Sequence, residues 1–334
     1  MKAPPKARIL GTGHYLPPTI RTNADIEKMV ETSDEWIRER TGIRERRIAP
    51  PEIVTSDMAA AAAENALKMA GLTAKDLDMI IVGTVTGDMP MPATAVFVQQ
   101  KIGATNIPSF DLSAACAGFI YGLSIADNFI RAGAMKHILV IGVELLSRVI
   151  DWDDRGTCVL FGDGAGAVIV GPADPTPVEK PRGILSTKIL SDGTLARSLM
   201  IPGGGSAMPA SHEVINEKNH KVKMRGQDIF KAAVKNLYSA SRDAVDEAGM
   251  RPDDVDWICP HQANLRIINQ AVERLGVVRE KVLVNIDKVG NTSSASIPIL
   301  LDQSMRAGTI KEGQTVLMCA LGAGISWGSA LIRV

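Results

Sequence analysis

Cysteine is scarce in this sequence, and the cysteines that occur are widely separated. The 334 residues contain four of them, which are Cys116, Cys158, Cys259 and Cys319. No C-x-x-C pair is present, which argues against a disulfide framework. His, Cys and carboxylate residues do not occur at the spacing of metal ligands either, so we expect no metal site. The pattern is typical of reduced thiols in a cytoplasmic protein.

An excess of charge and a membrane-spanning segment are also missing. The 37 lysine and arginine residues balance 37 aspartate and glutamate residues, which gives no support for nucleic acid or an anionic membrane as partner. Residues 1–6 lack the apolar core of a signal peptide. The longest uncharged run, 313–332, contains four glycines and favours two buried strands over a membrane helix. We therefore expect a cytoplasmic protein without membrane association.

The length and the hydrophobic pattern predict a two-part α/β protein. A chain of 334 residues is long for one simple core. Continuous apolar runs at 79–85 and 137–143 indicate strands buried on both faces. The alanine-rich segment 58–70, after Ser56 and Asp57 and before Gly71, indicates a long helix. The proline-rich segment 171–177 reads as a linker, so we predict halves at 1–175 and 176–334.

The second half repeats features of the first. Residues 66–80 resemble residues 244–258, and their glycines, Gly71 and Gly249, lie 178 positions apart. Residues 131–133 resemble residues 306–308 at an offset of 175. Two matched helix-to-strand units in the same order predict a tandem duplication with largely parallel sheets. The offset of 175 places Asn291 opposite Cys116, so we expect both at equivalent helix starts that face one cleft.

Cys116 is the first candidate for chemistry. It lies where an apolar strand pattern, 107–112, passes into a helical pattern, 117–131, among small residues. Backbone N–H groups and the dipole at a helix N-terminus favour the thiolate, which is the nucleophile. A buried structural cysteine is the alternative, because free cysteines are among the most buried residues.

His261 is the second candidate, because it lies just after the predicted strand 256–258, and strand ends in α/β sheets face the ligand crevice. Gln262 and Asn264 follow it closely. Cys, His and Asn also form the site of papain-like hydrolases, whose local signatures are absent here. The residues by themselves leave hydrolysis and acyl transfer open.

Seven motifs in order resemble those of the β-ketoacyl-acyl carrier protein synthase III family, the initiating condensing enzymes of type II fatty-acid synthesis. They are GTGHYLP (11–17), RTGIRER (40–46), AACAGF (114–119), FGDGAGA (161–167), HQANLR (261–266), GNTSSASIP (290–298) and WGSAL (327–331). The resemblance covers essentially the whole chain. It implies a thiolase-like α/β fold, with duplicated α/β halves in a five-layer αβαβα arrangement, and a homodimer.

The resemblance also implies a reaction. Cys116 would accept an acyl group from acyl-CoA, and malonyl-acyl carrier protein would lose CO2 and attack the acyl-cysteine to give 3-oxoacyl-acyl carrier protein. His261 and Asn291 match the residues that hydrogen-bond the malonyl thioester carbonyl. The backbone N–H groups of Cys116 and of the loop around Ala323 match an oxyanion hole. The resemblance implies no cofactor, with the CoA thioester as a substrate.

Further residues correspond to binding positions of the family. Trp36, Arg40 and Arg155 match contacts to the adenine and phosphates of CoA, and Asn264 matches a pantetheine contact. Lys231 and Arg266 match basic residues that meet the carrier protein. Met91, from the dimer partner, and Leu321 match positions at the acyl pocket.

The sequence departs from the family pattern at Leu321, where many members have Phe, and at Ala323, where they have Gly. The segment 206–221 is longer and more polar than the family minimum. A related enzyme of secondary metabolism, with another acyl donor or acceptor, is therefore the alternative. A degradative thiolase would need a second cysteine in the C-terminal glycine loop, whereas Cys319 falls in the predicted strand 316–320. A catalytically silent partner subunit would lack Cys116.

Overall fold

The structure is a computed structural model, and it describes residues 6–174 and 181–334. The predicted boundary between the halves, and part of the predicted linker 171–177, lie outside the described residues. The division at residues 175 and 176 therefore stays a prediction.

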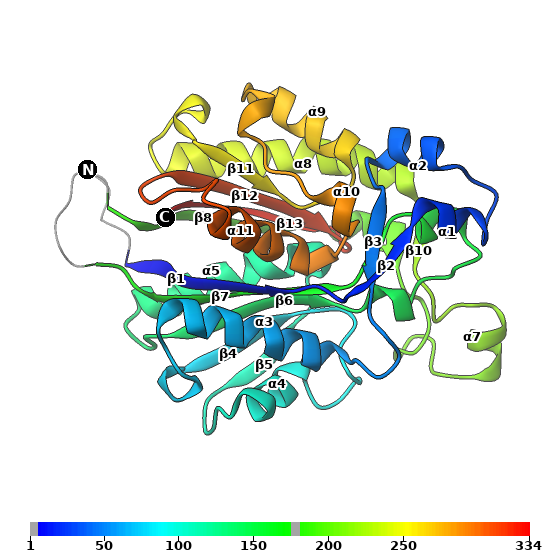
Figure 1. Cartoon of the computed structure of the whole chain (residues 1–334), viewed down its shortest axis with the longest axis horizontal. Coiled ribbons are helices and arrows are strands. Elements are labelled where there is room, and N and C mark those ends of the chain that lie inside the picture. The colour runs from blue at the N-terminus through cyan, green and yellow to red at the C-terminus, as the bar shows by residue number, and fades with distance from the viewer. Residues whose placement is uncertain (1–5, 175–180) are drawn as a thin grey trace.

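Two mixed sheets form the centre of the molecule (Figure 1). The first has the order β1-β7-β6-β4-β5 and the second has the order β11-β12-β13-β8. Their strands are β1 (Ala7–Tyr15), β4 (Met79–Gly83), β5 (Ser109–Leu112), β6 (Ile138–Glu144), β7 (Gly164–Pro172), β8 (Gly183–Ser191), β11 (Trp257–Pro260), β12 (Thr315–Gly322) and β13 (Ser326–Arg333).

The prediction of largely parallel sheets is wrong. Strand β4 pairs parallel with β5 and β6, and β11 pairs parallel with β12, but β7 and β13 pair antiparallel with both of their neighbours. The loop 323–325 that joins β12 to β13 is too short for a parallel crossover, which needs a dozen or more residues.

Helices cover the outer faces of both sheets and fill the space between them (Figure 1). One outer layer contains α3 (Thr55–Ala70) and α4 (Thr94–Ile102), and the other contains α8 (Gly226–Glu247) and α9 (Leu265–Leu275). The central layer contains α5 (Gly118–Arg131) and α11 (Ser296–Arg306). The predicted five-layer αβαβα arrangement is confirmed.

Shorter elements complete the chain. They are β2 (Thr19–Thr22), α1 (Asn23–Glu27), α2 (Asp34–Thr41), β3 (Glu45–Ile48), η1 (Ala74–Asp76), η3 (Leu146–Arg148), α6 (Arg155–Cys158), η4 (Gly193–Ser198), η5 (Pro252–Asp254), η6 (Arg279–Lys281) and α10 (Ile286–Val289).

Hydrophobic pattern and residue size explain the main elements. Every residue of β4 and β6 is buried, as their continuous apolar runs predict. The alanine-rich α3 begins three residues earlier than predicted, because Asp57 in its first turn accepts a hydrogen bond from the Val54 amide. The helix packs closely on β1, where a Cβ on Gly13 would lie 2.3 Å from the Ala62 carbonyl oxygen. Glycine is therefore required at that contact.

The uncharged run 313–332 forms β12 and β13, as predicted. Both strands are almost wholly buried in the second sheet. Within residues 6–174 and 181–334, none of the helices combines the length and apolar character that crossing a membrane requires.

The duplication is confirmed at the central layer, but the two halves align differently from the prediction. The turn η2 (Ala115–Ala117) precedes α5, and the turn η7 (Ser293–Ala295) precedes α11, 178 positions later. The first residue of each turn has a positive φ, 45° at Ala115 and 49° at Ser293. Because α5 has 14 residues and α11 has 11, the offset falls to 175 only at the helix ends. The position equivalent to Cys116 is therefore Ser294, and the pairing of Cys116 with Asn291 was wrong.

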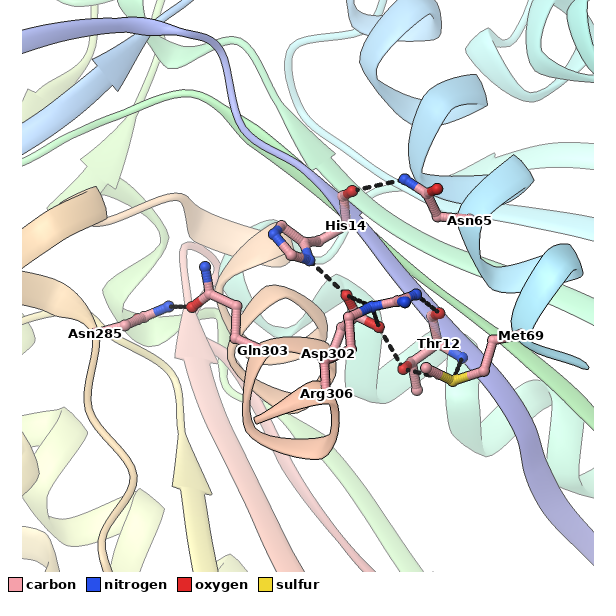
Figure 2. A network of polar contacts seen from close by, with 8 residues as sticks. All are labelled: Thr12, His14, Asn65, Met69, Asn285, Asp302, Gln303 and Arg306. Atoms are coloured by element: carbon pink, nitrogen blue, oxygen red, sulfur yellow. Dashed lines mark hydrogen bonds and ion pairs between the residues drawn. The ribbon is translucent and has the colours of Figure 1, made fainter. Parts of the chain in front are cut away.

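A network of polar contacts joins α11 to β1 (Figure 2). The buried carboxylate of Asp302 accepts hydrogen bonds from the Thr12 hydroxyl at 2.6 Å and from the Arg306 guanidinium at 2.9 Å, and it pairs with Nδ1 of His14 at 2.5 Å. Arg306 also donates to the Thr12 carbonyl oxygen at 3.0 Å. The helix that follows Asn291 is thereby held against the first sheet.

The long segment 203–222 is an excursion between two paired strands. Strand β9 (Leu199–Met200) pairs antiparallel with β10 (Lys223–Met224), and α7 (His212–Asn216) lies in the excursion. Lys218 anchors it by ion pairs to Asp151 at 2.8 Å and to Asp153 at 2.6 Å. The excursion is thus tied to the loop that precedes α6.

Candidate active site

An apolar cavity of about 230 Å³ lies beside the turn η2. Cys116 reaches its wall together with Ser293 and Ala323. Much of the remaining lining is apolar and includes Val85, Leu146, Phe161, Leu199, Ile201 and Val222. The cavity therefore offers a thiol at the wall of a space suited to a hydrocarbon chain.

Cys116 lies in the short turn before α5, close to the helix start that the sequence predicts. Burial raises the pKa of its thiol to about 12, although a hydrogen bond with Ser293 opposes this effect. Burial therefore favours the thiol form of Cys116, which opposes the expected effect of the helix terminus. A protonated Cys116 has to lose its proton when the sulfur reacts.

The loop after β12 approaches Cys116 through a glycine. A Cβ on Gly322 would lie 2.5 Å from the Cys116 backbone nitrogen, so a larger residue would displace one of the two segments. Ala323, the next residue, lines the cavity. The structure thus brings together the two segments that were predicted to form an oxyanion hole.

His261 follows β11, as predicted, and is 3% exposed. Its backbone N–H donates to the Cys319 carbonyl oxygen at 2.8 Å. Both ring nitrogens are buried and have no hydrogen-bond partner among the described residues. Burial lowers the pKa of His261 to about 3, so the ring is neutral at pH 7. An unpaired buried ring indicates a place where a ligand supplies the missing partner.

Asn291 is held on both sides by the first half of the chain. Its backbone N–H donates to the Leu160 carbonyl oxygen at 2.9 Å, and its carbonyl oxygen accepts from the Gly162 N–H at 3.0 Å. Its side-chain Oδ1 accepts from the Ser293 N–H at 2.8 Å. Because Oδ1 is engaged, the Nδ2 group is the end of the amide that remains to donate to a substrate.

Contacts among the loops connect the segments that carry the three predicted residues. Ser293 bonds to Asn291 and lines the cavity beside Cys116. The N–H of Gln262, next to His261, donates to Ser296 Oγ at 2.7 Å, at the start of α11. His261 is also bonded to β12, the strand that ends at Gly322 against Cys116.

Sequence reasoning missed two polar residues beside Cys116. Glu144, the last residue of β6, has no exposed surface, and its carboxylate accepts a hydrogen bond from Ser293 Oγ at 3.1 Å. Burial raises the pKa of Glu144 to about 7. The signal for Glu144 was a charged residue at the end of an otherwise apolar strand. Ser293 had no local signal beyond its place in the motif 290–298.

The residues predicted to contact CoA form a cluster at α2, α6 and α9. The guanidinium carbon of Arg155 lies 5.2 Å from the centre of the Trp36 ring, and that of Arg40 lies 6.0 Å from it. Asn264 caps α9 by accepting from the Arg266 N–H at 2.8 Å, and it donates to the Arg40 carbonyl oxygen at 3.0 Å. The structure therefore gives Asn264 a structural role at the junction of α2 and α9.

The predicted carrier-protein residues lie on neighbouring outer helices. Lys231, on α8, and Arg266, on α9, are both exposed. The Arg266 guanidinium carbon lies 5.7 Å from the centre of the Phe230 ring. Arg266 lies two residues after Asn264, so it is close in the chain to the predicted CoA contacts.

Neither of the two predicted acyl-pocket residues is among the residues that line the Cys116 cavity. Met91 is 84% exposed. Leu321 is buried, but it packs in a cluster with Val234, Ile267 and Ile325, so the structure does not place it in the cavity lining. Leu321 points away because side chains alternate along β12.

Within the described part of the chain, no group of three or more His, Cys, Asp or Glu side chains is arranged to hold a metal ion.

The fold and the site together define a class of protein. Two α/β halves each place a helix in the layer between two sheets, with a cysteine in one helix-start turn and a histidine and an asparagine on segments that contact the other. This is the arrangement of a thiolase-fold condensing enzyme.

Comparison with known proteins gives the family. Residues 110–193 match the family described as 3-Oxoacyl-[acyl-carrier-protein (ACP)] synthase III, and residues 245–334 match its C-terminal part. The β-ketoacyl-[acyl-carrier-protein] synthase III of Caldanaerobacter subterraneus is 53% identical over 327 residues, which cover 98% of this chain and 97% of that one. The chain belongs to the β-ketoacyl-acyl carrier protein synthase III family and is an acyltransferase.

Solved structures agree. The 3-oxoacyl-[acyl-carrier-protein] synthase III of Aquifex aeolicus is 46% identical, with a TM-score of 0.89 over 98% of this chain and 100% of that one. The priming β-ketosynthase of the R1128 polyketide pathway is 37% identical, with a TM-score of 0.89 over 100% of this chain and 98% of that one.

Proposed function

We propose that the protein joins an acyl-CoA primer to malonyl-acyl carrier protein with loss of CO2 and so initiates fatty-acid synthesis, with Cys116 as nucleophile. The observation that carries the proposal is the buried site itself. A thiol lies at the wall of an apolar cavity, and the loops that hold it also hold an unpaired neutral histidine and an asparagine with a free amide donor.

In the first half-reaction the Cys116 sulfur loses its proton and attacks the thioester carbonyl of acyl-CoA. The bond between that carbonyl and the CoA sulfur breaks, CoA leaves and takes up a proton, and the acyl group remains on Cys116. The apolar cavity receives the acyl chain. Backbone N–H groups of Cys116 and of the loop at Ala323 stabilise the oxyanion that forms during transfer.

In the second half-reaction malonyl-acyl carrier protein loses CO2 and leaves an enolate. The Asn291 amide and a ring N–H of His261 donate to the thioester oxygen as negative charge develops there. The enolate carbon then attacks the acyl-cysteine carbonyl, the new C–C bond forms, and the Cys116 sulfur leaves and regains a proton. One such donor contributes about 10²–10³ to a rate constant.

CoA binds across the cluster of Trp36, Arg40 and Arg155. An indole ring and guanidinium groups suit an adenine ring and phosphates, through stacking and charge. Lys231 and Arg266 extend the same face with exposed positive charge, which suits an acidic carrier protein.

The experiment incubates the protein with acyl-CoA donors of increasing chain length and measures the mass of the intact protein. We expect a mass increase of one acyl group, located by peptide mapping on Cys116. The Cys116→Ala variant should not be acylated, whereas the Cys158→Ala variant, which changes a buried cysteine outside the cavity, should be. Acylation of the Cys116→Ala protein would refute the assignment. Malonyl-acyl carrier protein added afterwards should release CO2 and a 3-oxoacyl product.

A further inference from the structure

Glu144 is a buried carboxylate that carries no ion pair among the described residues. Its partners are all hydroxyl and amide groups. Thr86 Oγ1 donates to it at 2.5 Å, the Val85 N–H at 3.1 Å, and Ser293 Oγ at 3.1 Å. Weaker contacts at 3.3 and 3.4 Å come from Thr84 and Ser294. A buried carboxyl without a cation is costly to retain for structure alone, so a chemical role is indicated.

Ser293 connects this carboxylate to the reactive thiol. Its hydroxyl bonds to Glu144, and Ser293 lines the same cavity as Cys116. A hydrogen bond with Ser293 also acts to lower the pKa of Cys116. Its backbone is held separately, by the N–H bond to Asn291 Oδ1 and by a positive φ of 49°. A hydroxyl can donate one proton while it accepts another. Ser293 is therefore placed to pass a proton from sulfur to carboxylate.

Charge decides where the thiol proton goes. If it left to solvent, a thiolate would form near an ionised Glu144, which would place two negative charges in a largely buried site. The Glu144 carboxylate indeed acts to raise the pKa of Cys116. Transfer of the proton to Glu144 keeps a single negative charge in the buried site while the sulfur attacks.

We propose that Glu144 accepts the thiol proton of Cys116 through the hydroxyl of Ser293 when the sulfur attacks its substrate. The S–H bond of Cys116 breaks and its proton passes to Ser293 Oγ, whose own proton passes to a carboxylate oxygen of Glu144. The sulfur electron pair forms the bond to the acyl carbon. When the acyl group later leaves sulfur in the condensation, the proton returns by the same route.

Charged groups next to β6 and its neighbouring strands are engaged elsewhere. Asp163, before β7, accepts from Ala49 and Ser147, and Asp88, after β4, accepts from Ser56. Arg148, in η3, donates to the carbonyl oxygens of Pro50 and Pro51. Cys116 on η2 and the neutral His261 after β11 are the remaining titratable groups of the site. A pH step in the reactivity of Cys116 therefore reports Glu144.

The experiment measures the single-turnover rate of Cys116 acylation by acetyl-CoA between pH 5.5 and 9. In the wild type the rate should rise to a plateau through a step near pH 7, where Glu144 ionises. Glu144→Gln keeps the size of the side chain but cannot accept a proton, and Ser293→Ala interrupts the path. We expect each to lower the plateau by about 10²-fold or more and to remove the step. The double variant should lose little more than either single variant.

A matched control distinguishes proton transfer from packing. Ser294→Ala removes another hydroxyl that faces the same carboxylate, from the same turn, but Ser294 does not line the cavity. The Ser294→Ala variant should keep the pH step of the wild type, and its rate of Cys116 acylation should stay within a few-fold of the wild-type rate. Decarboxylation by enzyme that has already been acylated should be far less affected in the Ser293→Ala variant, since the Asn291 contact is a backbone bond. Equal loss in both half-reactions, or an unchanged step in Glu144→Gln or Ser293→Ala, would overturn the proposal.

The inference rests on the proposed role of Cys116 as nucleophile, so one measurement is independent of acyl-CoA. Alkylation of Cys116 by iodoacetamide needs the same proton transfer but no CoA thioester. If the wild type is not acylated by any acyl-CoA, the proposed function fails. The inference about Glu144 then stands or falls on whether the pH step in alkylation is present in the wild type and absent from Glu144→Gln.

Discussion

Burial sets the chemistry of the side chains around the cavity. It raises the pKa of Cys116 to about 12 and that of Glu144 to about 7, and it lowers the pKa of His261 to about 3. Burial therefore favours the neutral form of each of these three groups. A neutral ring at His261 donates a hydrogen bond without bringing a proton that would quench the enolate.

The alanine variants of His261 and Asn291 should separate the two half-reactions. We expect each to lower malonyl decarboxylation by about 10²-fold or more, because each removes one donor to the developing oxyanion. Acylation of Cys116 should be much less affected. Release of CO2 from acylated enzyme and the intact mass after acyl-CoA treatment measure the two steps. An equal loss in both would contradict the proposed division of roles.

Glu144 should make folding stability depend on pH. Its pKa is about 7 in the folded protein and 4.5 in the reference state, so the folded protein holds the proton more tightly than the unfolded chain. The wild type should therefore lose stability, relative to Glu144→Gln, as the pH rises from about 4.5 to about 7. The shift corresponds to about 3 kcal/mol. Urea unfolding of both proteins at pH 5 and pH 8 measures it, and a pH-independent difference would contradict it.

At the scale of elements, the two central helices carry equivalent acidic residues with different surroundings. Asp302 and Arg306 on α11 correspond to Asp127 and Arg131 on α5, at the offset of 175. Burial acts to raise the pKa of both carboxyls. Hydrogen bonds from His14, Arg306 and Thr12 nevertheless hold the pKa of Asp302 below its ordinary value, whereas the pKa of Asp127, which bonds only to Arg131 among the described residues, is raised. The network in Figure 2 therefore favours the ionised form of Asp302, and the ionised Asp302 stabilises the folded protein.

Asp302→Asn should lower the free energy of unfolding by about 3–5 kcal/mol at pH 7, because it leaves buried partners on β1 and α11 unpaired. Since the pKa of Asp302 is lowered on folding, the loss should shrink as the pH falls below about 4. Asp127→Asn is the matched control on α5 and should cost much less. Urea denaturation of the three proteins tests this, and similar values for the two variants would be evidence against the role of the network.

At the scale of the whole molecule, exposed apolar side chains gather near one edge of the first sheet. Met91 is 84% exposed, and Met89, Val85 and Val96 are 40–48% exposed. Strand β5, at the edge of that sheet, has a free hydrogen-bonding side among the described residues. Val85 also lines the Cys116 cavity, so this surface continues to the site. An apolar edge of this kind is expected to be covered by a second copy of the chain.

We therefore predict a homodimer in which Met91 lines the acyl pocket of the partner. Met91→Trp should lower activity on long acyl-CoA donors while leaving acetyl-CoA comparatively unaffected, because a flexible side chain is replaced by a bulky, stiff one. A donor series measures the effect, and sedimentation at micromolar concentration measures the dimer. A monomer, or an unchanged donor profile, would remove this prediction.

The sequence by itself determined the duplicated α/β layers and the buried strands, and it predicted Cys116 as the nucleophile. These follow from local properties. Apolar runs predict β4 and β6, and a glycine at position 71 ends α3. The small residues of the motif around Cys116 are its neighbours in the sequence. The placement of His261 after a strand was also a local inference, because the predicted strand 256–258 ends just before it, and β11 extends to Pro260.

Only the tertiary structure decided how the site is charged and aligned. The protonated state of Cys116 depends on loss of water, which arises from residues far apart in the chain. The partnership of Glu144 with Ser293, 149 positions later, has no periodic signal. The equivalence of Cys116 with Ser294 rather than Asn291 depends on the three fewer residues in α11 than in α5, which a constant offset conceals. Hydrophobic periodicity acts between near neighbours, whereas desolvation and register are set by the packing of the two halves.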